Sequence, residues 1–243
     1  MRRPLISKHR IENGAVVLHV LSSIGAEGAR VAVAIVPGLS ESAEDWRFAI
    51  EGLSPVGAAA VSLRGRGSSD SPAYGYSLLD HCSDIAAFVQ SVPAQKVIVV
   101  AFSRSVSYAL EYAVGGPPKL AGLVLLDYPP RHTALPSGWS AAIGESSWRG
   151  RRVGDLLSHS VLAAIGREAE FKDFSPLLPQ IGVPTLVIQG GAAGAALACQ
   201  RCGCVRGGPA KLRRRATQRL VAFSVGAGAK GADRTHCRVR GEV

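Results

Sequence analysis

The sequence has no hydrophobic run long enough to cross a membrane, because proline and glycine interrupt its apolar stretches after a few residues. Its first residues, Met-Arg-Arg-Pro, are not followed by the apolar stretch of a secretory signal. Aromatic residues make up only 6% of the 243 residues and charged residues 19%, whereas hydrophobic residues reach 47%. This balance excludes a disordered chain and predicts a globular, cytoplasmic protein with no membrane partner.

Acidic residues are few: 18 Asp and Glu stand against 28 Lys and Arg, for a net charge of +10. Almost all of the excess lies after residue 190, where eleven basic residues face two acidic ones and four of the five cysteines occur. The rest of the chain is nearly neutral, so the charge does not predict a specific nucleic-acid partner. We therefore divide the chain into residues 1–191 and a basic tail, residues 192–243, which we expect to be irregular or disordered.

Three explanations of the tail remain open. Residues 199–204 hold three cysteines, which together with His236 and Cys237 could bind zinc. The arginines at residues 213–215 could contact phosphates, although no recognisable nucleic-acid-binding motif accompanies them. We hypothesise instead that a frameshift, in the gene or in its reading, produced the tail, which resequencing would test.

Apolar runs and amphipathic stretches alternate along the first part of the chain. Continuous apolar runs predict strands buried on both faces, and the stretches between them predict helices. The predicted strands are residues 31–36, 58–63, 96–101, 120–126 and 184–189, and the predicted helices are residues 44–53, 77–92 and 105–114. This alternation predicts an α/β fold with a mostly parallel, doubly wound sheet.

Two further features complete this prediction. Asn13-Gly14 predicts a two-residue hairpin turn between strands at residues 9–12 and 15–21. Residues 128–183 are too many for a simple crossover, and they predict a small helical cap over the carboxyl ends of the strands. The alternative is a pair of surface helices with no role as a lid.

A serine stands between a predicted strand and the helix directly behind it. Residues 101–105 read Ala-Phe-Ser-Arg-Ser. A tight turn here lifts the Ser103 hydroxyl above the sheet and leaves the backbone N–H of Arg104 free for an oxyanion. The alternative is an ordinary junction in which Ser103 is the N-cap of the helix.

Residues 101–105 resemble the nucleophile elbow, G-x-S-x-G, of the α/β-hydrolase fold family, with alanine and serine in place of the glycines. Three further segments resemble that family in the same order along the chain. They are residues 36–39 (the oxyanion loop), residues 62–70 (the structural stretch D-x-R-G-x-G-x-S-D, here with an initial serine) and residues 183–191 (the late strand). The resemblance covers about residues 10–191 and implies an α/β-hydrolase fold.

The resemblance also implies a serine, an acid and a histidine in that order along the chain. Ser103 would be the nucleophile, and the backbone N–H groups of Leu39 and Arg104 would form the oxyanion hole. No carboxylate follows residues 190–191, where relatives commonly carry the acid, so Asp127 becomes the candidate acid. A role as a turn or cap residue at a strand end is the alternative for Asp127.

His236 is the candidate base, because it alone follows the strand predicted at residues 218–225. The implied function is hydrolysis of an ester or similar bond of a small apolar substrate through an acyl-enzyme, with no cofactor and no metal. The alternative is a catalytically inactive or truncated relative that lacks its histidine.

Overall fold

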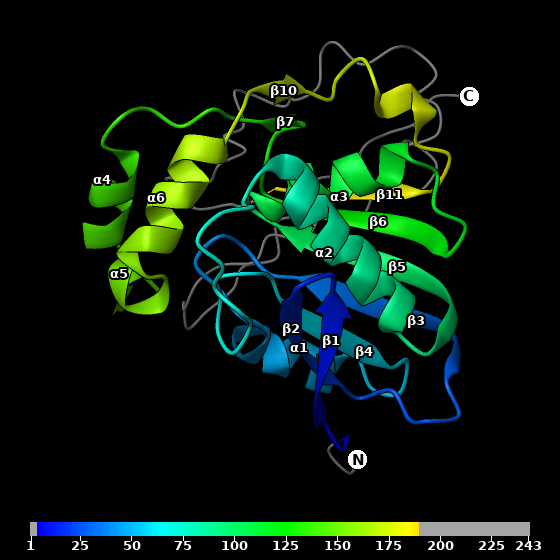
Figure 1. The fold of residues 1–243 in the computed structure, drawn as a ribbon. Coiled ribbons are helices and arrows are strands. Elements are labelled where there is room, and N and C mark those ends of the chain that lie inside the picture. The colour runs from blue at the N-terminus through cyan, green and yellow to red at the C-terminus, as the bar shows by residue number, and fades with distance from the viewer. Residues whose placement is uncertain (1–3, 190–243) are drawn as a thin grey trace, which may run out of the picture.

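The computed structural model describes residues 4–189, which form a seven-stranded sheet with helices on both faces (Figure 1). The strands lie in the order β1-β2-β4-β3-β5-β6-β11. They are β1 (Ser7–Asn13), β2 (Val16–Ser22), β3 (Ala29–Val36), β4 (Ala58–Ser62), β5 (Ala94–Phe102), β6 (Leu120–Leu126) and β11 (Thr185–Ile188). The last five strands in this order are parallel to one another, and β2 is antiparallel to both of its neighbours. The predicted mostly parallel α/β sheet is confirmed.

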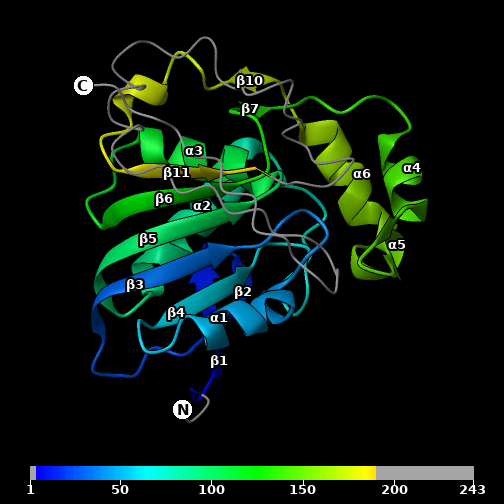
Figure 2. The ribbon, with the colours of Figure 1, turned by 180° about the vertical axis from the view of Figure 1, so that it is seen from behind.

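Helix α1 covers one face of this sheet, and α2 and α3 cover the other (Figures 1 and 2). The α-helices are α1 (Arg47–Gly52), α2 (Leu78–Ser91), α3 (Ser105–Val114), α4 (Trp139–Glu145), α5 (Val153–Leu156) and α6 (His159–Glu168). Short elements complete the described chain: the 3-10 helices η1 (Ala43–Trp46) and η2 (Leu178–Gln180), and the strands β7 (Arg131–His132), β8 (Ser147–Trp148), β9 (Arg151–Arg152) and β10 (Lys172–Asp173). Among the helices of residues 4–189, none is long and apolar enough to span a bilayer.

Strand β3 shows why a continuous apolar run becomes a central strand. Successive side chains of a strand point to opposite faces of the sheet. Ala32, Ala34 and Val36 lie in the core beneath α2 and α3, whereas Val33 and Ile35 pack on the side of α1. Both faces are buried, so the strand lacks the alternation of apolar and polar residues that a half-exposed strand would have.

The hairpin between β1 and β2 is confirmed, but its predicted turn is wrong by one residue. Asn13 pairs with Val16, so Gly14 and Ala15 form the turn, and Gly14 has a φ of +61°. A glycine at the first central position is typical of a type II′ turn. The Asn13 side chain donates hydrogen bonds to Ser83 Oγ (2.7 Å) and Asp84 Oδ1 (2.8 Å), which keeps Asn13 within its strand.

The segment predicted as a cap contains α4, α5 and α6, which share a small hydrophobic core of their own. Buried members of this core include Val153, Leu157 and Leu162, and Leu39 of the main unit packs against it. Figure 2 shows these helices beyond the end of the sheet to which the β3 arrow points. The helices therefore lie near the carboxyl ends of the parallel strands.

Strands β3 and β5 are neighbours, yet the helices that follow them lie on opposite faces of the sheet. Their carboxyl ends therefore flank the point at which the winding of the sheet reverses. Open α/β sheets bind their ligands in the crevice at such a point. The predicted elbow follows β5, and the predicted oxyanion loop follows β3.

Candidate active site

Ser103 occupies a sharp turn between β5 and α3. Its φ is +53°, a left-handed conformation that non-glycine residues rarely adopt. The Ser103 N–H donates to the carbonyl of Leu126 (2.9 Å), and the Ser103 carbonyl accepts from the N–H of Val106 (2.9 Å). Helix α3 begins at Ser105 with Arg104 as its N-cap, so the alternative in which Ser103 is the N-cap is wrong. This backbone is the one a nucleophile elbow requires.

Small residues let the loop after β3 lie directly against this turn. A Cβ atom on Gly38 would lie only 3.0 Å from the Phe102 ring and 3.4 Å from Ser103 Cβ, so this approach requires glycine. Ser105, which replaces the second glycine of the usual motif, donates a hydrogen bond from Oγ to the carbonyl of Pro37 (2.5 Å). The substitution therefore adds a link between the elbow and the loop.

The two backbone N–H groups predicted to bind an oxyanion differ from that of Gly38 in their hydrogen bonding. The Gly38 N–H donates to Glu41 Oε2 (3.1 Å). Within the described part of the chain, the N–H groups of Leu39 and Arg104 donate no hydrogen bond. They therefore remain available to a ligand, as an oxyanion hole requires, and their role stays a prediction.

Glu41 joins the loop after β3 to the cap, a role that sequence reasoning missed. Its buried carboxylate accepts from the indole N–H of Trp46 (2.8 Å) as well as from Gly38. Its second oxygen accepts from the indole N–H of Trp148 (3.1 Å) and pairs with Arg149 (3.0 Å). Trp148 lies 107 residues from Glu41, so no local pattern could have identified the pair.

Asp127 leaves the sheet beside Ser103. Phe102 and Leu126, the residues before them, are partners in the parallel pairing of β5 and β6. Asp127 has a φ of +52°, and its N–H donates to the carbonyl of Ile188 (2.8 Å). The two predicted site residues thus emerge at the same end of adjacent strands. His236 and the tail cysteines lie outside the described residues.

A model of the alpha/beta hydrolase family matches residues 33–237 of the chain. The chain belongs to the α/β-hydrolase family. The match extends past residue 191, where the resemblance based on motifs ended. A search of curated proteins finds no significant match.

Solved structures with the same fold support this membership. The enol-lactonase from Burkholderia xenovorans LB400 is similar with a TM-score of 0.66 and 16% identity, over 89% of this chain and 91% of that chain. E-2-(acetamidomethylene)succinate hydrolase has a TM-score of 0.63 and 19% identity, over 91% of each chain. The thioesterase domain from the curacin biosynthetic pathway has a TM-score of 0.60 and 18% identity, over 91% and 94%. At such identities the likeness concerns the fold.

Two buried histidines of this α/β-hydrolase lie near the elbow, but neither can serve as its base. His132 Nε2 accepts from Arg104 Nη2 (2.9 Å), because a guanidinium can only donate, and its Nδ1 bonds to Ser107 Oγ (2.8 Å). His81 accepts in the same way from Arg66 (2.8 Å), and its Nδ1 bonds to a carbonyl. In residues 4–189 no histidine hydrogen-bonds to Ser103.

Burial keeps both rings neutral. It lowers the pKa of His132 to about 3, and the charge of Arg104 acts in the same direction. Burial also lowers the pKa of His81 well below its ordinary value, as does the charge of Arg66. Rings that stay neutral and are occupied at both nitrogens have a structural role here.

We expect His132 to make the fold sensitive to acid. Below pH 6.5 the unfolded chain binds a proton at this residue that the folded chain does not bind until about pH 3. The free energy of unfolding therefore falls as the pH falls through this window, by about 1–2 kcal/mol between pH 7 and 5. Urea denaturation at both pH values checks this result, with His132→Asn losing less stability on acidification. An equal loss in the two proteins would contradict it.

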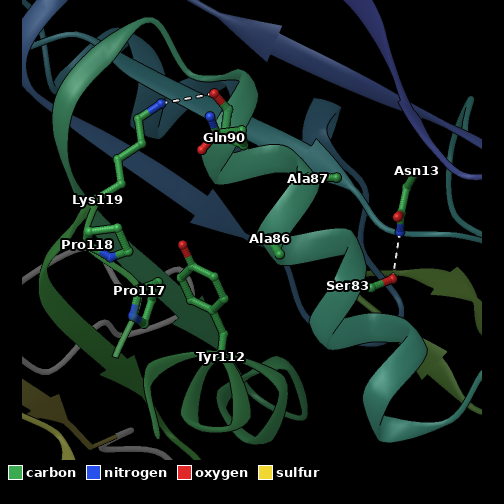
Figure 3. Close-up of a pocket in the computed structure, with 9 residues that line it drawn as sticks. All are labelled: Asn13, Ser83, Ala86, Ala87, Gln90, Tyr112, Pro117, Pro118 and Lys119. Carbon is green, nitrogen blue, oxygen red and sulfur yellow. Dashed lines mark hydrogen bonds between the residues drawn. The ribbon is translucent and has the colours of Figure 1, made fainter. Parts of the chain in front are cut away.

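The α/β-hydrolase also has a surface depression between α2, α3 and the loop before β6 (Figure 3). It lies near the carboxyl end of α3, whereas Ser103 precedes the other end of that helix. Polar groups in its wall already have partners: Asn13 bonds to Ser83 (2.7 Å), and Lys119 Nζ bonds to the carbonyl of Gln90 (3.0 Å). Neither Ser103 nor Asp127 is among the described residues that line it.

Proposed function

We propose that this α/β-hydrolase cleaves an ester or similar bond of a small substrate, with Ser103 as the nucleophile. The observation that carries the proposal is the left-handed backbone of Ser103, φ +53°, between β5 and α3. Serine gains nothing from this conformation as a packing residue, and such strain in a non-glycine residue occurs chiefly at functional sites. The family supports hydrolysis, and the serine supports an acyl-enzyme route.

In the proposed reaction, Ser103 Oγ attacks the substrate carbonyl carbon and gives its proton to a base. The carbonyl oxygen becomes an oxyanion, which accepts hydrogen bonds from the N–H groups of Leu39 and Arg104. Collapse of this intermediate expels the alcohol, which takes up the proton, and leaves an acyl group on Ser103. Water then releases the acid and regenerates the serine.

The base and its orienting acid are proposed from the sequence. His236 would accept the proton, and Asp127 would hold the imidazole in the productive orientation and stabilise its charged form. The position of Asp127, at the end of the strand next to the elbow, supports its part of the proposal.

A catalytically inactive member of the family is the second candidate. The observation that favours it is that no histidine of residues 4–189 contacts Ser103. Without a base, a serine hydroxyl is a poor nucleophile at neutral pH.

Rapid mixing of the full chain with p-nitrophenyl acetate distinguishes the two candidates. The proposed function predicts a burst of p-nitrophenolate that scales with protein concentration, followed by slower steady turnover. Release at the rate of buffer alone would contradict the proposed function and favour the inactive relative.

A further inference from the structure

A continuous buried cluster lies beneath the elbow, and the proposed reaction does not use it. The cluster consists of Arg66, His81, Tyr108, His132 and Arg104. Arg66 bonds to His81 (2.8 Å), whose ring stacks on that of Tyr108 with centroids 4.3 Å apart. The Tyr108 ring lies 5.6 Å from that of His132, which bonds to Arg104 (2.9 Å). The two arginines are thus joined through three rings.

Arg66 is only 2% exposed, and its hydrogen-bond acceptors are all neutral. Its Nε donates to the carbonyl of Leu39 (3.3 Å), and its Nη1 donates to the carbonyl of Arg64 (2.6 Å) and to His81. Its Nη2 is buried and has no hydrogen-bond partner within residues 4–189. Burial accordingly lowers the pKa of Arg66.

Arg104 is also buried, and its guanidinium also donates only to neutral acceptors within residues 4–189. It is 5% exposed, and it donates to Thr133 Oγ1 (3.1 Å), to the carbonyl of Thr133 (3.1 Å) and to His132. Its Nε is buried and has no hydrogen-bond partner in the described part of the chain. Each arginine therefore retains an N–H group for a further acceptor.

No carboxylate within residues 4–189 forms an ion pair with either arginine. Asp84, a buried acid of this region, is occupied by Arg64 through bonds of 2.8 and 2.9 Å. A buried charge without an opposite charge is strongly unfavourable. The cluster thus lacks an anion that would complete it.

The Arg66 guanidinium is adjacent to the proposed oxyanion hole, since it donates to the carbonyl of Leu39. The Arg104 guanidinium is directed instead to Thr133 and His132. Arg66 also lines a hollow of about 240 Å³ between the main unit and the cap. The acidic residues of this wall each pair with a cap arginine: Glu41 with Arg149, Asp45 with Arg151 and Asp155 with Arg152. Arg66 is therefore the charged residue in the wall of this hollow that forms no ion pair with any described residue.

We propose that Arg66 binds a carboxylate group of the substrate, so that the enzyme acts on carboxylate-bearing esters, such as monoesters of dicarboxylic acids. Guanidinium groups form strong, charge-assisted hydrogen bonds to carboxylates. This inference rests on the proposed function and replaces the apolar substrate expected from the sequence with an anionic one.

A pair of substrates with acyl groups of equal length tests the inference: mono-p-nitrophenyl glutarate and p-nitrophenyl valerate. We expect kcat/KM to be at least about 10-fold higher for the glutarate ester, because its carboxylate forms charge-assisted hydrogen bonds that valerate cannot form. This preference should fall to about 1 or below in Arg66→Met, and persist in part in Arg66→Lys. Arg30→Met, an exposed substitution at the other end of β3, should keep it. Equal kcat/KM values for the two esters in the wild type would overturn the inference.

A measurement without turnover separates this inference from the proposed function. Glutarate is expected to raise the melting temperature of the Ser103→Ala chain, whereas valeramide of the same chain length should not. Stabilisation by glutarate without hydrolysis of either ester by the wild type would support the anion site and contradict the nucleophile. Hydrolysis without any stabilisation by glutarate would support the nucleophile and contradict the anion site. If an arginine variant fails to fold, the ester preference of the wild type and the effect of glutarate on the melting temperature of Ser103→Ala still test the inference.

Discussion

Replacing Ser103 by alanine is expected to lower kcat for p-nitrophenyl acetate by about three orders of magnitude or more. The substitution removes the only atom that forms the acyl bond, and enzymes that lose their serine nucleophile retain little beyond oxyanion stabilisation and binding. Steady-state hydrolysis at pH 7.5, measured beside the wild type, checks the result.

Ser83→Ala is the matched control, because Ser83 is an exposed serine on α2. It should retain wild-type turnover. The burst of p-nitrophenolate should also vanish in Ser103→Ala and persist in the control. Equal turnover by Ser103→Ala and the wild type would exclude Ser103 as the nucleophile.

Asp84→Ala is expected to lower the free energy of unfolding by about 3–5 kcal/mol, because it leaves the buried Arg64 guanidinium with only the longer ion pair to Asp80 (3.5 Å). The Asp84 side chain is 0% exposed. It accepts from Arg64 Nη2 (2.8 Å), Arg64 Nε (2.9 Å) and Asn13 Nδ2 (2.8 Å). The carboxylate therefore joins the loop after β4 and the β1–β2 hairpin to α2. Urea denaturation followed by circular dichroism measures the loss.

Glu145→Ala provides the comparison, since this side chain is 75% exposed and pairs only with the exposed Arg152. Exposed ion pairs contribute little to stability, so its urea midpoint should stay close to that of the wild type. Similar midpoints for Asp84→Ala and Glu145→Ala would show that the buried pair does not stabilise the fold.

The main unit was predictable because its signals are local. Residues 32–36 of β3 are apolar throughout since both faces of the strand are buried there, and Ser105–Val114 follows a tight turn that sets its start. The β1–β2 turn was misplaced by one residue because the Asn13 side chain bonds to α2, seventy residues away. Such contacts depend on the completed fold.

In the candidate site, too, the residues with local sequence signals were predictable and those that meet only in the folded chain were not. Ser103 could be located from the pattern around it, because a strand, a tight turn and a helix follow one another directly. The partners of Glu41 and the cluster of Arg66 and Arg104 could not be found, since cap and loop residues meet only in three dimensions. Asp127 was placed by strand order, and His236 rests on its position after the last predicted strand.

Covalent capture of the nucleophile tests the central claim most directly. Diisopropyl fluorophosphate should phosphorylate the full chain once, and trypsin should then release the modified residues 97–104, between Lys96 and the bond after Arg104. Ser103 is the only hydroxyl residue in this peptide, Val-Ile-Val-Val-Ala-Phe-Ser-Arg, so its mass locates the adduct. The account predicts this modified peptide in the wild type and none in Ser103→Ala. An unmodified peptide from wild-type protein, or an adduct on another serine, would contradict it.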